Sequence, residues 1–231
     1  MRWLVGLFLL ASPAAAVTCQ NIEYLGTSYT TCEVRAGEDL QLFLRDDDGD
    51  ILGRFSAIEN DTGRTLAFAM NAGMYHPDRD PVGHYIEDGV QESRVISSDG
   101  PGNFGLLPNG IFCIADTLQV FETFDYLDRQ PDCTYAVQSG PMLVIDGALH
   151  PRFLADGTSK FIRNGVGTSS DGTRAIFAIS NDAVNFHDFG ALFRDHLALP
   201  NALYFDGKVS RLYAPALNRS DFGWQLGPIV G

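Results

Sequence analysis

Short apolar runs that end in glycine-containing turns are the sequence feature that most restricts how this chain of 231 residues can fold. Runs of this kind predict β-strands, because turn-forming residues bound each one and leave little room for long helices. Asp-Gly recurs as the turn at residues 88–89, 146–147 and 171–172. The predicted strands, some with their turns, are residues 40–44, 51–55, 65–70, 85–89, 109–115, 119–124, 142–145, 163–166, 175–179 and 202–205.

One helix interrupts this pattern. Asn185 is suited to cap it, because its side chain can accept a hydrogen bond from a free backbone N–H of the first turn. Apolar residues then recur every three or four positions, at Phe186, Phe189, Leu192, Phe193 and Leu197. Together with strands 175–179 and 202–205, the helix predicts a βαβ unit whose two strands are parallel. Asp206 follows the second strand, at the end where α/β sheets usually bind ligands.

The acidic run at residues 46–50 lies between two predicted strands. It could belong to a calcium loop, but its register differs from that motif and the closing Glu is absent. A hairpin turn is therefore the preferred interpretation.

Residues 1–16 have the features of a secretory signal peptide. Arg2 is basic, an apolar stretch follows it, and residues 14–16 are three alanines. The apolar stretch is about half of the roughly 20 residues that a membrane-spanning helix needs. We therefore expect a secreted, periplasmic protein in which residues 17–231 form a single domain, with no membrane insertion after cleavage.

Four cysteines remain in residues 17–231, and an even number in an exported chain favours disulfides. Three pairings are possible, of which we predict the sequential one, Cys19–Cys32 and Cys113–Cys133. A zinc site is the alternative, but the Cys and His spacing of such sites is lacking.

The net charge of −13 becomes −14 if Arg2 leaves with the signal peptide. Such a chain repels nucleic acids and anionic membrane surfaces at long range. An anionic substrate would need local attraction from backbone N–H groups, a buried arginine or a bound cation.

Three segments place a polar side chain at a glycine turn after an apolar strand: residues 70–75, 138–142 and 204–208. Glycine lets the backbone approach a ligand closely, and successive N–H groups can hold an anion. The alternative is that these segments are ordinary strand ends.

These segments resemble the motifs of the phosphodiester glycosidase family. The family's motifs and their counterparts are an N-G-G-F-like turn at 71–75, S-G-P-x-L at 139–143, R-T-A-x-G at 163–167, and N-L-D-G-G-G-S-S at 204–211. Runs 101–110 and 200–204 further resemble a bacterial periplasmic branch of the family. The chain departs from the family pattern at Lys208 and Val209, which replace two glycines, and at Asn164-Gly165, which replace Thr-Ala.

Together with the strand pattern, the resemblance implies an α+β fold with a large twisted mixed β-sheet core, few helices and one C-terminal βαβ unit. It also implies a hydrolase that cleaves a sugar-1-phosphodiester at the glycosidic C–O bond. The leaving phosphate monoester has a second pKa of about 6, so it departs more easily than an alcohol. The enzyme must then stabilise the departing phosphate and activate water or attack the anomeric carbon.

We assign Asp206 the role of base or nucleophile. Arg163 is the predicted phosphate clamp, because a planar guanidinium suits phosphate oxygens. Asn71 and the backbone at Gly73 and Gly140 would orient sugar hydroxyls or phosphate oxygens.

Two further candidate residues, Glu87 and His187, each have a non-catalytic interpretation as well. Glu87 could be a second carboxylate or a solvent-facing strand residue, and His187 a proton carrier or a helix-surface residue. Ser139 lacks a nucleophile elbow, so its hydroxyl is expected to support the turn near the substrate. Gly207 and Ser210 are included as substrate-binding residues of the closing motif.

A divalent cation, calcium or magnesium before zinc, could help to bind an anionic substrate. Candidate ligands are Asp206, Asp78, His76, His84 and His150. Their spacing matches no metal motif, so no metal site is assigned.

Two rival functions stay open. One is a non-catalytic envelope protein that binds phosphate-containing glycans in the same cleft. The other is a metal-dependent phosphodiesterase that breaks the P–O bond instead of the sugar C–O bond.

Overall fold

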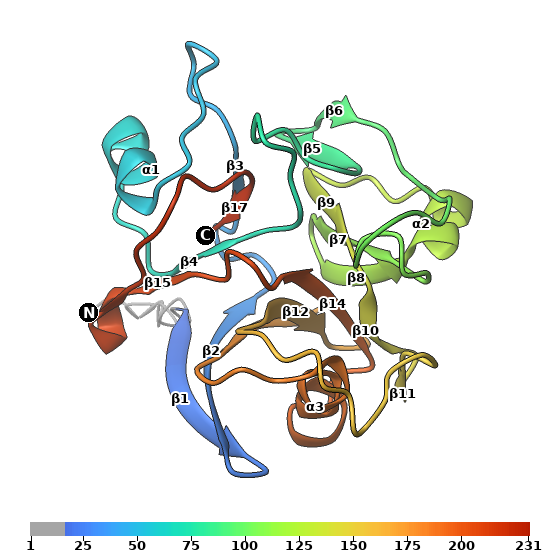
Figure 1. Cartoon of the computed structure of the whole chain (residues 1–231). Helices are drawn as coiled ribbons and strands as arrows, with labels where there is room; N and C mark the ends of the chain where they lie inside the picture. The colour runs from blue at the N-terminus through green and yellow to red at the C-terminus, as the bar shows by residue number, and fades with distance from the viewer. Residues whose placement is uncertain (1–16) are drawn as a thin grey trace, which may run out of the picture.

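The computed structural model describes residues 17–231, in which the strands form three sheets (Figure 1). The seven-stranded sheet has the order β1 (Thr18–Tyr24), β2 (Thr27–Arg35), β13 (Arg174–Ser180), β12 (Asn164–Thr168), β14 (Asn201–Asp206), β10 (Met142–Ile145) and β11 (Ala148–Leu149). One five-stranded sheet has the order β16 (Arg219–Ser220), β15 (Leu212–Ala214), β4 (Ala69–Asn71), β17 (Ile229–Val230) and β3 (Leu42–Phe43). The other has the order β6 (Val90–Ser93), β5 (Tyr85–Glu87), β9 (Tyr135–Ser139), β7 (Gly110–Ile114) and β8 (Leu118–Glu122). The predicted signal peptide lies outside the described residues.

Helices are few and short, which confirms the predicted α+β class. They are α1 (Phe55–Thr62), α2 (Thr123–Arg129) and α3 (Phe186–Ala191), with a π-helical turn at Leu192–His196 and a 3₁₀ turn at Pro215–Leu217. The predicted cap of α3 is confirmed, because the Asn185 side chain accepts a hydrogen bond of 2.7 Å from the Asp188 N–H.

The connection through α3 differs from a simple βαβ unit. Strands β13 and β14 run in the same direction, as predicted, but β12 lies between them and is antiparallel to both. A tight turn at residues 169–173 joins β12 to β13, so β12 occupies the place beside β13 before the chain reaches β14. The described strand pairs are all antiparallel and are divided among three sheets, whereas the sequence suggested one mixed sheet.

The acidic run at residues 46–50 forms the predicted hairpin turn. Arg45 and Ile51 make an antiparallel bridge, and the Asp46 N–H donates to the Asp50 carbonyl at 3.0 Å. The second predicted strand does not extend to residue 55, because Phe55 begins α1.

A hydrophobic core connects the three sheets. Phe177 and Phe205 of the seven-stranded sheet, Met70 of β4, and Phe112 and Val137 of the third sheet belong to one buried cluster. The opposite face of the seven-stranded sheet is covered by α3, in a cluster that includes Phe189, Leu192 and Phe193 (Figure 1). Burial of these apolar side chains stabilises the arrangement of the sheets and thereby fixes where the ends of β4, β12 and β14 meet.

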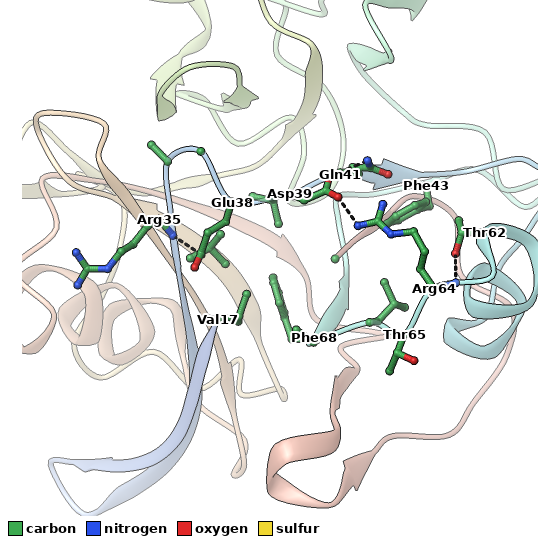
Figure 2. A pocket seen from close by; sticks show the side chains of 17 residues that line it. Val17, Arg35, Glu38, Asp39, Gln41, Phe43, Thr62, Arg64, Thr65 and Phe68 are labelled. Atoms are coloured by element: carbon green, nitrogen blue, oxygen red, sulfur yellow. Dashed lines mark hydrogen bonds and ion pairs between the residues drawn. The ribbon is translucent and has the colours of Figure 1, made fainter. Parts of the chain in front are cut away.

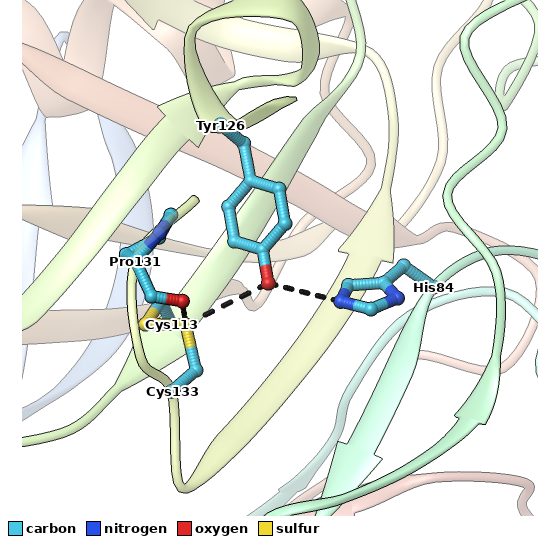
Figure 3. The surroundings of a disulfide bond; sticks show 5 residues. All are labelled: His84, Cys113, Tyr126, Pro131 and Cys133. Atoms are coloured by element: carbon cyan, nitrogen blue, oxygen red, sulfur yellow. Dashed lines mark hydrogen bonds between the residues drawn. A yellow bond between two sulfur atoms is a disulfide. The ribbon is translucent and has the colours of Figure 1, made fainter. Parts of the chain in front are cut away.

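Both predicted disulfides are present. Cys19 and Cys32 are directly opposite each other on β1 and β2, and Cys113 of β7 is joined to Cys133, just before β9. Figure 3 shows the Tyr126 hydroxyl next to the second disulfide, 3.8 Å from Cys133 Sγ and 2.9 Å from Nε2 of His84. Across residues 17–231, the helices are too short or too polar to cross a membrane.

Candidate active site

Two buried asparagines form the centre of the candidate site. Asn71 ends β4 and Asn164 begins β12, and both side chains are fully buried. Nδ2 of Asn164 donates to the backbone carbonyl of Asn71 at 2.9 Å and to its Oδ1 at 3.0 Å. This pair joins the five-stranded sheet of β4 to the seven-stranded sheet.

The same pair fixes the start of the segment that follows β14. Oδ1 of Asn164 accepts from the Asp206 N–H at 3.1 Å and from the Ser210 hydroxyl at 3.2 Å. Oδ1 of Asn71 accepts from the Arg211 N–H at 2.9 Å. Residues 206–211 are thus held at both ends by one amide pair. Because their polar atoms are used internally, the two asparagines position the site and do not present themselves to a ligand.

The Asp206 carboxylate is partly buried beside this pair. Burial raises the pKa of Asp206, while the N–H groups of Lys208 and Gly207 and the Lys208 charge oppose that rise. Oδ1 of Asp206 accepts from the Lys208 N–H at 2.8 Å. The carboxyl group is therefore oriented by the backbone of its own turn, with a proton affinity higher than that of an exposed aspartate.

Two tyrosines share the surroundings of Asp206. Burial raises the pKa of Tyr204 and that of Tyr75, and the negative charge of Asp206 adds to both effects. Gly207 is required next to Tyr204, because a Cβ at this position would overlap the tyrosine hydroxyl. The candidate site thus combines the Asp206 carboxylate with the partly exposed Tyr75 and a fully buried Tyr204.

The predicted glycine turns lie around the same region and are closely packed. Gly73 has a φ of +94°, and a Cβ there would lie 2.9 Å from Cγ2 of Val137. A Cβ on Gly140 would lie 2.7 Å from Cβ of Asn109. The Ser139 hydroxyl donates to the Phe205 carbonyl at 2.9 Å, so it supports the strand that leads to Asp206, in line with its predicted role.

Arg163 is fully buried instead of exposed to a substrate. Its Nε donates to the Val184 carbonyl and one terminal nitrogen to the Ser159 carbonyl, both at 2.9 Å. The guanidinium carbon lies 3.6 Å from the centroid of the Phe186 ring. Its Nη1 atom is buried and has no hydrogen-bond partner in the described part of the chain. A phosphate could reach this atom only if the covering segment moved, so Arg163 is not an exposed clamp in this structure.

Glu87 and His187 lie apart from Asp206 and make other contacts. Glu87 is on β5 in the third sheet, where it accepts a hydrogen bond of 2.6 Å from the Tyr85 hydroxyl. Burial raises the pKa of Glu87 to about 7. His187 is on α3, with Nδ1 3.3 Å from Oδ1 of Asp188.

Sequence reasoning missed Asn164, Tyr75 and Tyr204 as site residues. Asn164 stands where the family motif has Thr, and the importance of its side chain depends on a register between β12 and β14 that spacing does not reveal. Tyr204 and Tyr75 were visible only as apolar neighbours of the glycine turns.

A cavity of about 610 Å³ lies elsewhere (Figure 2). It opens beside Val17 and is lined by apolar residues such as Phe43 and Phe68 together with the ion pair between Arg64 and Asp39. Asn71, Asn164 and Asp206 do not line it. Its size alone does not make it the reaction site, because it does not bring together the groups that the chemistry needs.

Candidate metal ligands do not converge in residues 17–231: no three His, Cys, Asp or Glu side chains there are close enough to hold an ion. His84 contacts Ser93 and Tyr126, and His150 contacts the Leu107 carbonyl and the Arg152 N–H.

Comparisons with known proteins show the family of the chain. Residues 64–225 match the family model described as phosphodiester glycosidase, and this range contains Asn71, Asn164 and Asp206. The chain is 33% identical over 195 residues to the uncharacterised protein YigE of Escherichia coli (strain K12), covering 84% of this chain and 75% of YigE.

A solved structure has a similar fold. It is the catalytic domain of zebrafish N-acetylglucosamine-1-phosphodiester alpha-N-acetylglucosaminidase, auto-inhibited by its pro-peptide. The TM-score is 0.64 at 14% identity, and the match covers 95% of this chain and 84% of the zebrafish domain.

Replacement of Asn164 by Ala should lower the free energy of unfolding by about 3 kcal/mol, because it removes the side-chain hydrogen bonds to the buried Asn71 and to the Asp206 N–H. Chemical denaturation measures this change. Asn181→Ala is the control, since Asn181 is exposed and its loss should cost well under half as much. Equal effects of the two variants would contradict the central role of the asparagine pair.

Glu87 should make the protein less stable as the pH rises. Its pKa is raised from 4.5 to about 7 on folding, so the folded state binds more protons than the unfolded state between these values. The stabilisation is complete below pH 4.5 and is lost as the pH rises to about 7. Glu87→Gln should make Tm depend less on pH in this range. Glu23→Gln, which changes an exposed residue of β1, should leave the pH dependence of Tm as it is. An unchanged pH slope in Glu87→Gln would refute this account.

Proposed function

Because the chain belongs to the phosphodiester glycosidase family, we propose that it hydrolyses a sugar-1-phosphodiester at the glycosidic C–O bond. The predicted signal peptide supports action in the bacterial cell envelope, on a phosphate-linked glycan or a small sugar phosphodiester. The observation that carries the proposal is the position of Asp206, a partly buried carboxylate held where the ends of β4, β12 and β14 meet.

Asp206 acts on the anomeric carbon in this proposal, either by attacking it or by taking a proton from the water that attacks it. The sugar–oxygen bond breaks, its electron pair leaves with the phosphate monoester, and a water oxygen ends on the sugar. A phosphate monoester leaves readily, so a strong general acid is less necessary than in glycosidases that expel an alcohol. A single well-placed carboxylate is therefore sufficient for the proposed chemistry.

The surrounding groups have supporting roles. Asn71 and Asn164 position the 206–211 segment, and Ser139 supports β14 from the neighbouring turn. The Tyr75 side chain is partly exposed, and its protonated hydroxyl could donate to a substrate oxygen in place of the Gln225 carbonyl. Tyr204 is fully buried and supports the turn at Gly207 instead. Donors that are already oriented toward developing charge stabilise a transition state more than mobile ones.

Two rival functions make different predictions for the same site. A phosphodiesterase would break the P–O bond, and a binding protein would retain the substrate without turnover. The identity of the broken bond separates the first rival from the proposed glycosidase.

Hydrolysis in oxygen-18 water should place the label in the released sugar, because water replaces the phosphate at carbon in C–O cleavage. Mass spectrometry of both products measures this. Label in the phosphate would identify a phosphodiesterase, and no turnover of a panel of sugar-1-phosphodiesters would favour a binding protein.

The pH profile of kcat/KM should rise through the pKa of Asp206, because only the ionised carboxylate can act as base or nucleophile. Burial raises that pKa, so the acidic limb should lie above the usual range of an aspartate, and the rate should fall as the pH drops through it. Asp206→Asn should reduce kcat roughly 10³-fold or more. The control is Asp116→Asn, which removes an exposed carboxylate from the turn between β7 and β8. Similar rates in both variants would exclude a catalytic role for Asp206.

A further inference from the structure

The loop Asp221–Leu226 is tied directly to the candidate site. The Arg211 N–H donates to Oδ1 of Asn71, and the Arg211 guanidinium donates to the Trp224 carbonyl. The Tyr75 hydroxyl donates to the Gln225 carbonyl at 3.4 Å. Both Arg211 and Tyr75 therefore connect this loop to groups next to Asp206.

A small pocket of about 130 Å³ lies between this loop and α1. Two arginines, Arg54 and Arg211, line it, and only 8% of Arg211 is exposed. Two carboxylates, Glu59 and Asp221, also line the pocket. They are already engaged by other donors, with Glu59 accepting from the N–H of residue 66 and Asp221 from the guanidinium of residue 219. Asp221 is thus paired with another guanidinium, whereas Glu59 is held by neutral donors and keeps its charge.

In residues 17–231, three arginines lie near this pocket without a carboxylate bound to them, although the whole chain carries −13. Among the described residues, no carboxylate forms a salt bridge with Arg54, Arg79 or Arg211. The Arg79 guanidinium carbon lies 5.3 Å from the centroid of the Tyr75 ring. Burial lowers the pKa of Arg211, and the like charges of Arg54 and Arg79 lower it further, while Tyr75 and Asp221 oppose this shift. An anion placed among these groups would relieve their repulsion.

Exposed aromatic rings continue the same surface. Phe222 is 94% exposed and Trp224 is 83% exposed, on a loop whose backbone is held by Arg211. Large apolar side chains gathered at a surface commonly mark a binding site. An indole ring offers a flat apolar face with a polar N–H at its edge, which matches a sugar ring with an apolar face and polar hydroxyls.

We infer that Arg211 and the loop Asp221–Leu226 form the subsite for the aglycone side of a phosphodiester, in which Arg211 binds a phosphate oxygen and an aglycone sugar stacks on Trp224. This inference rests on the proposed function, since it takes the sugar phosphodiester as the ligand. It assigns phosphate recognition to Arg211 and its neighbour Arg79, because Arg211 lines a pocket and is 8% exposed, whereas Arg163 is fully buried. The chemistry recognised is a sugar joined through phosphate to a second sugar.

Tryptophan fluorescence tests this subsite directly. The sequence has two tryptophans, Trp3 and Trp224, so a protein that begins at Val17 reports on Trp224 alone. The protein with Asp206→Asn should be titrated with a sugar-1-phosphodiester whose aglycone is a second sugar, with the matching methyl diester, and with inorganic phosphate. The first ligand should shift the emission to shorter wavelengths in a saturable way, and the other two should leave it nearly unchanged.

Steady-state kinetics give an independent readout. Trp224→Ala should raise KM about tenfold for the diester whose aglycone is a second sugar, called here the glycosyl diester. It should raise KM clearly less for the methyl diester and change kcat little for either. Arg79→Gln should raise KM for both diesters, because both carry the phosphate. Arg211→Lys keeps a positive charge but loses the planar guanidinium, and it should also raise KM for both. The control is Phe124→Ala, which removes an exposed aromatic ring from α2.

The outcomes separate this inference from the proposed function. Turnover of the glycosyl diester with unchanged Trp224 emission and an unchanged KM in Trp224→Ala would overturn the subsite and leave the glycosidase intact. A saturable emission shift without turnover of any phosphodiester would support the subsite and overturn the proposed reaction. An equal rise of KM for both diesters in Trp224→Ala would show that Trp224 does not contact the aglycone.

Discussion

The hydrogen-bonded pair of Asn71 and Asn164 is the constraint on which the candidate site depends. Two fully buried amides must satisfy their polar atoms with each other and with nearby backbone groups, because water cannot reach them. Their bonds extend to Asp206, Ser210 and Arg211, so the sheet that contains β4 and the sheet that contains β12 and β14 meet at one fixed geometry. The hydrophobic core brings the sheets together, and the amide pair determines how the ends of β4, β12 and β14 are placed relative to one another.

This arrangement explains why a partly buried carboxylate is retained at position 206. Burial makes its ionised form less favourable, and the amides of its own turn restore part of the lost stabilisation. The result is a carboxylate that is oriented by N–H donors and is still partly exposed. In the proposed reaction Arg79 and Arg211 supply the positive charge that a phosphate needs. Both lie on the side of Tyr75, which itself is close to Asp206.

Local features of the fold could be predicted from the sequence, whereas contacts between distant strands could not. The turn at 46–50, the cap at Asn185 and both disulfides follow from short-range patterns or from cysteine number, and the structure confirms them. The insertion of β12 between β13 and β14 depends on register, which neighbouring residues do not specify. For the same reason the sequence pointed to Arg163 as a phosphate clamp without showing that Ser159 and Phe186 cover its guanidinium, and it missed Asn164. Family motifs indicated Asp206 because they reflect the site as a whole.

The most direct test is a crystal structure of the protein with Asp206→Asn, soaked with a small sugar-1-phosphodiester. The account predicts that the anomeric carbon lies next to the side chain at position 206, with Tyr75 in contact with the ligand. A ligand found only in the 610 Å³ cavity beside Val17, or elsewhere away from Asn71 and Asn164, would contradict it.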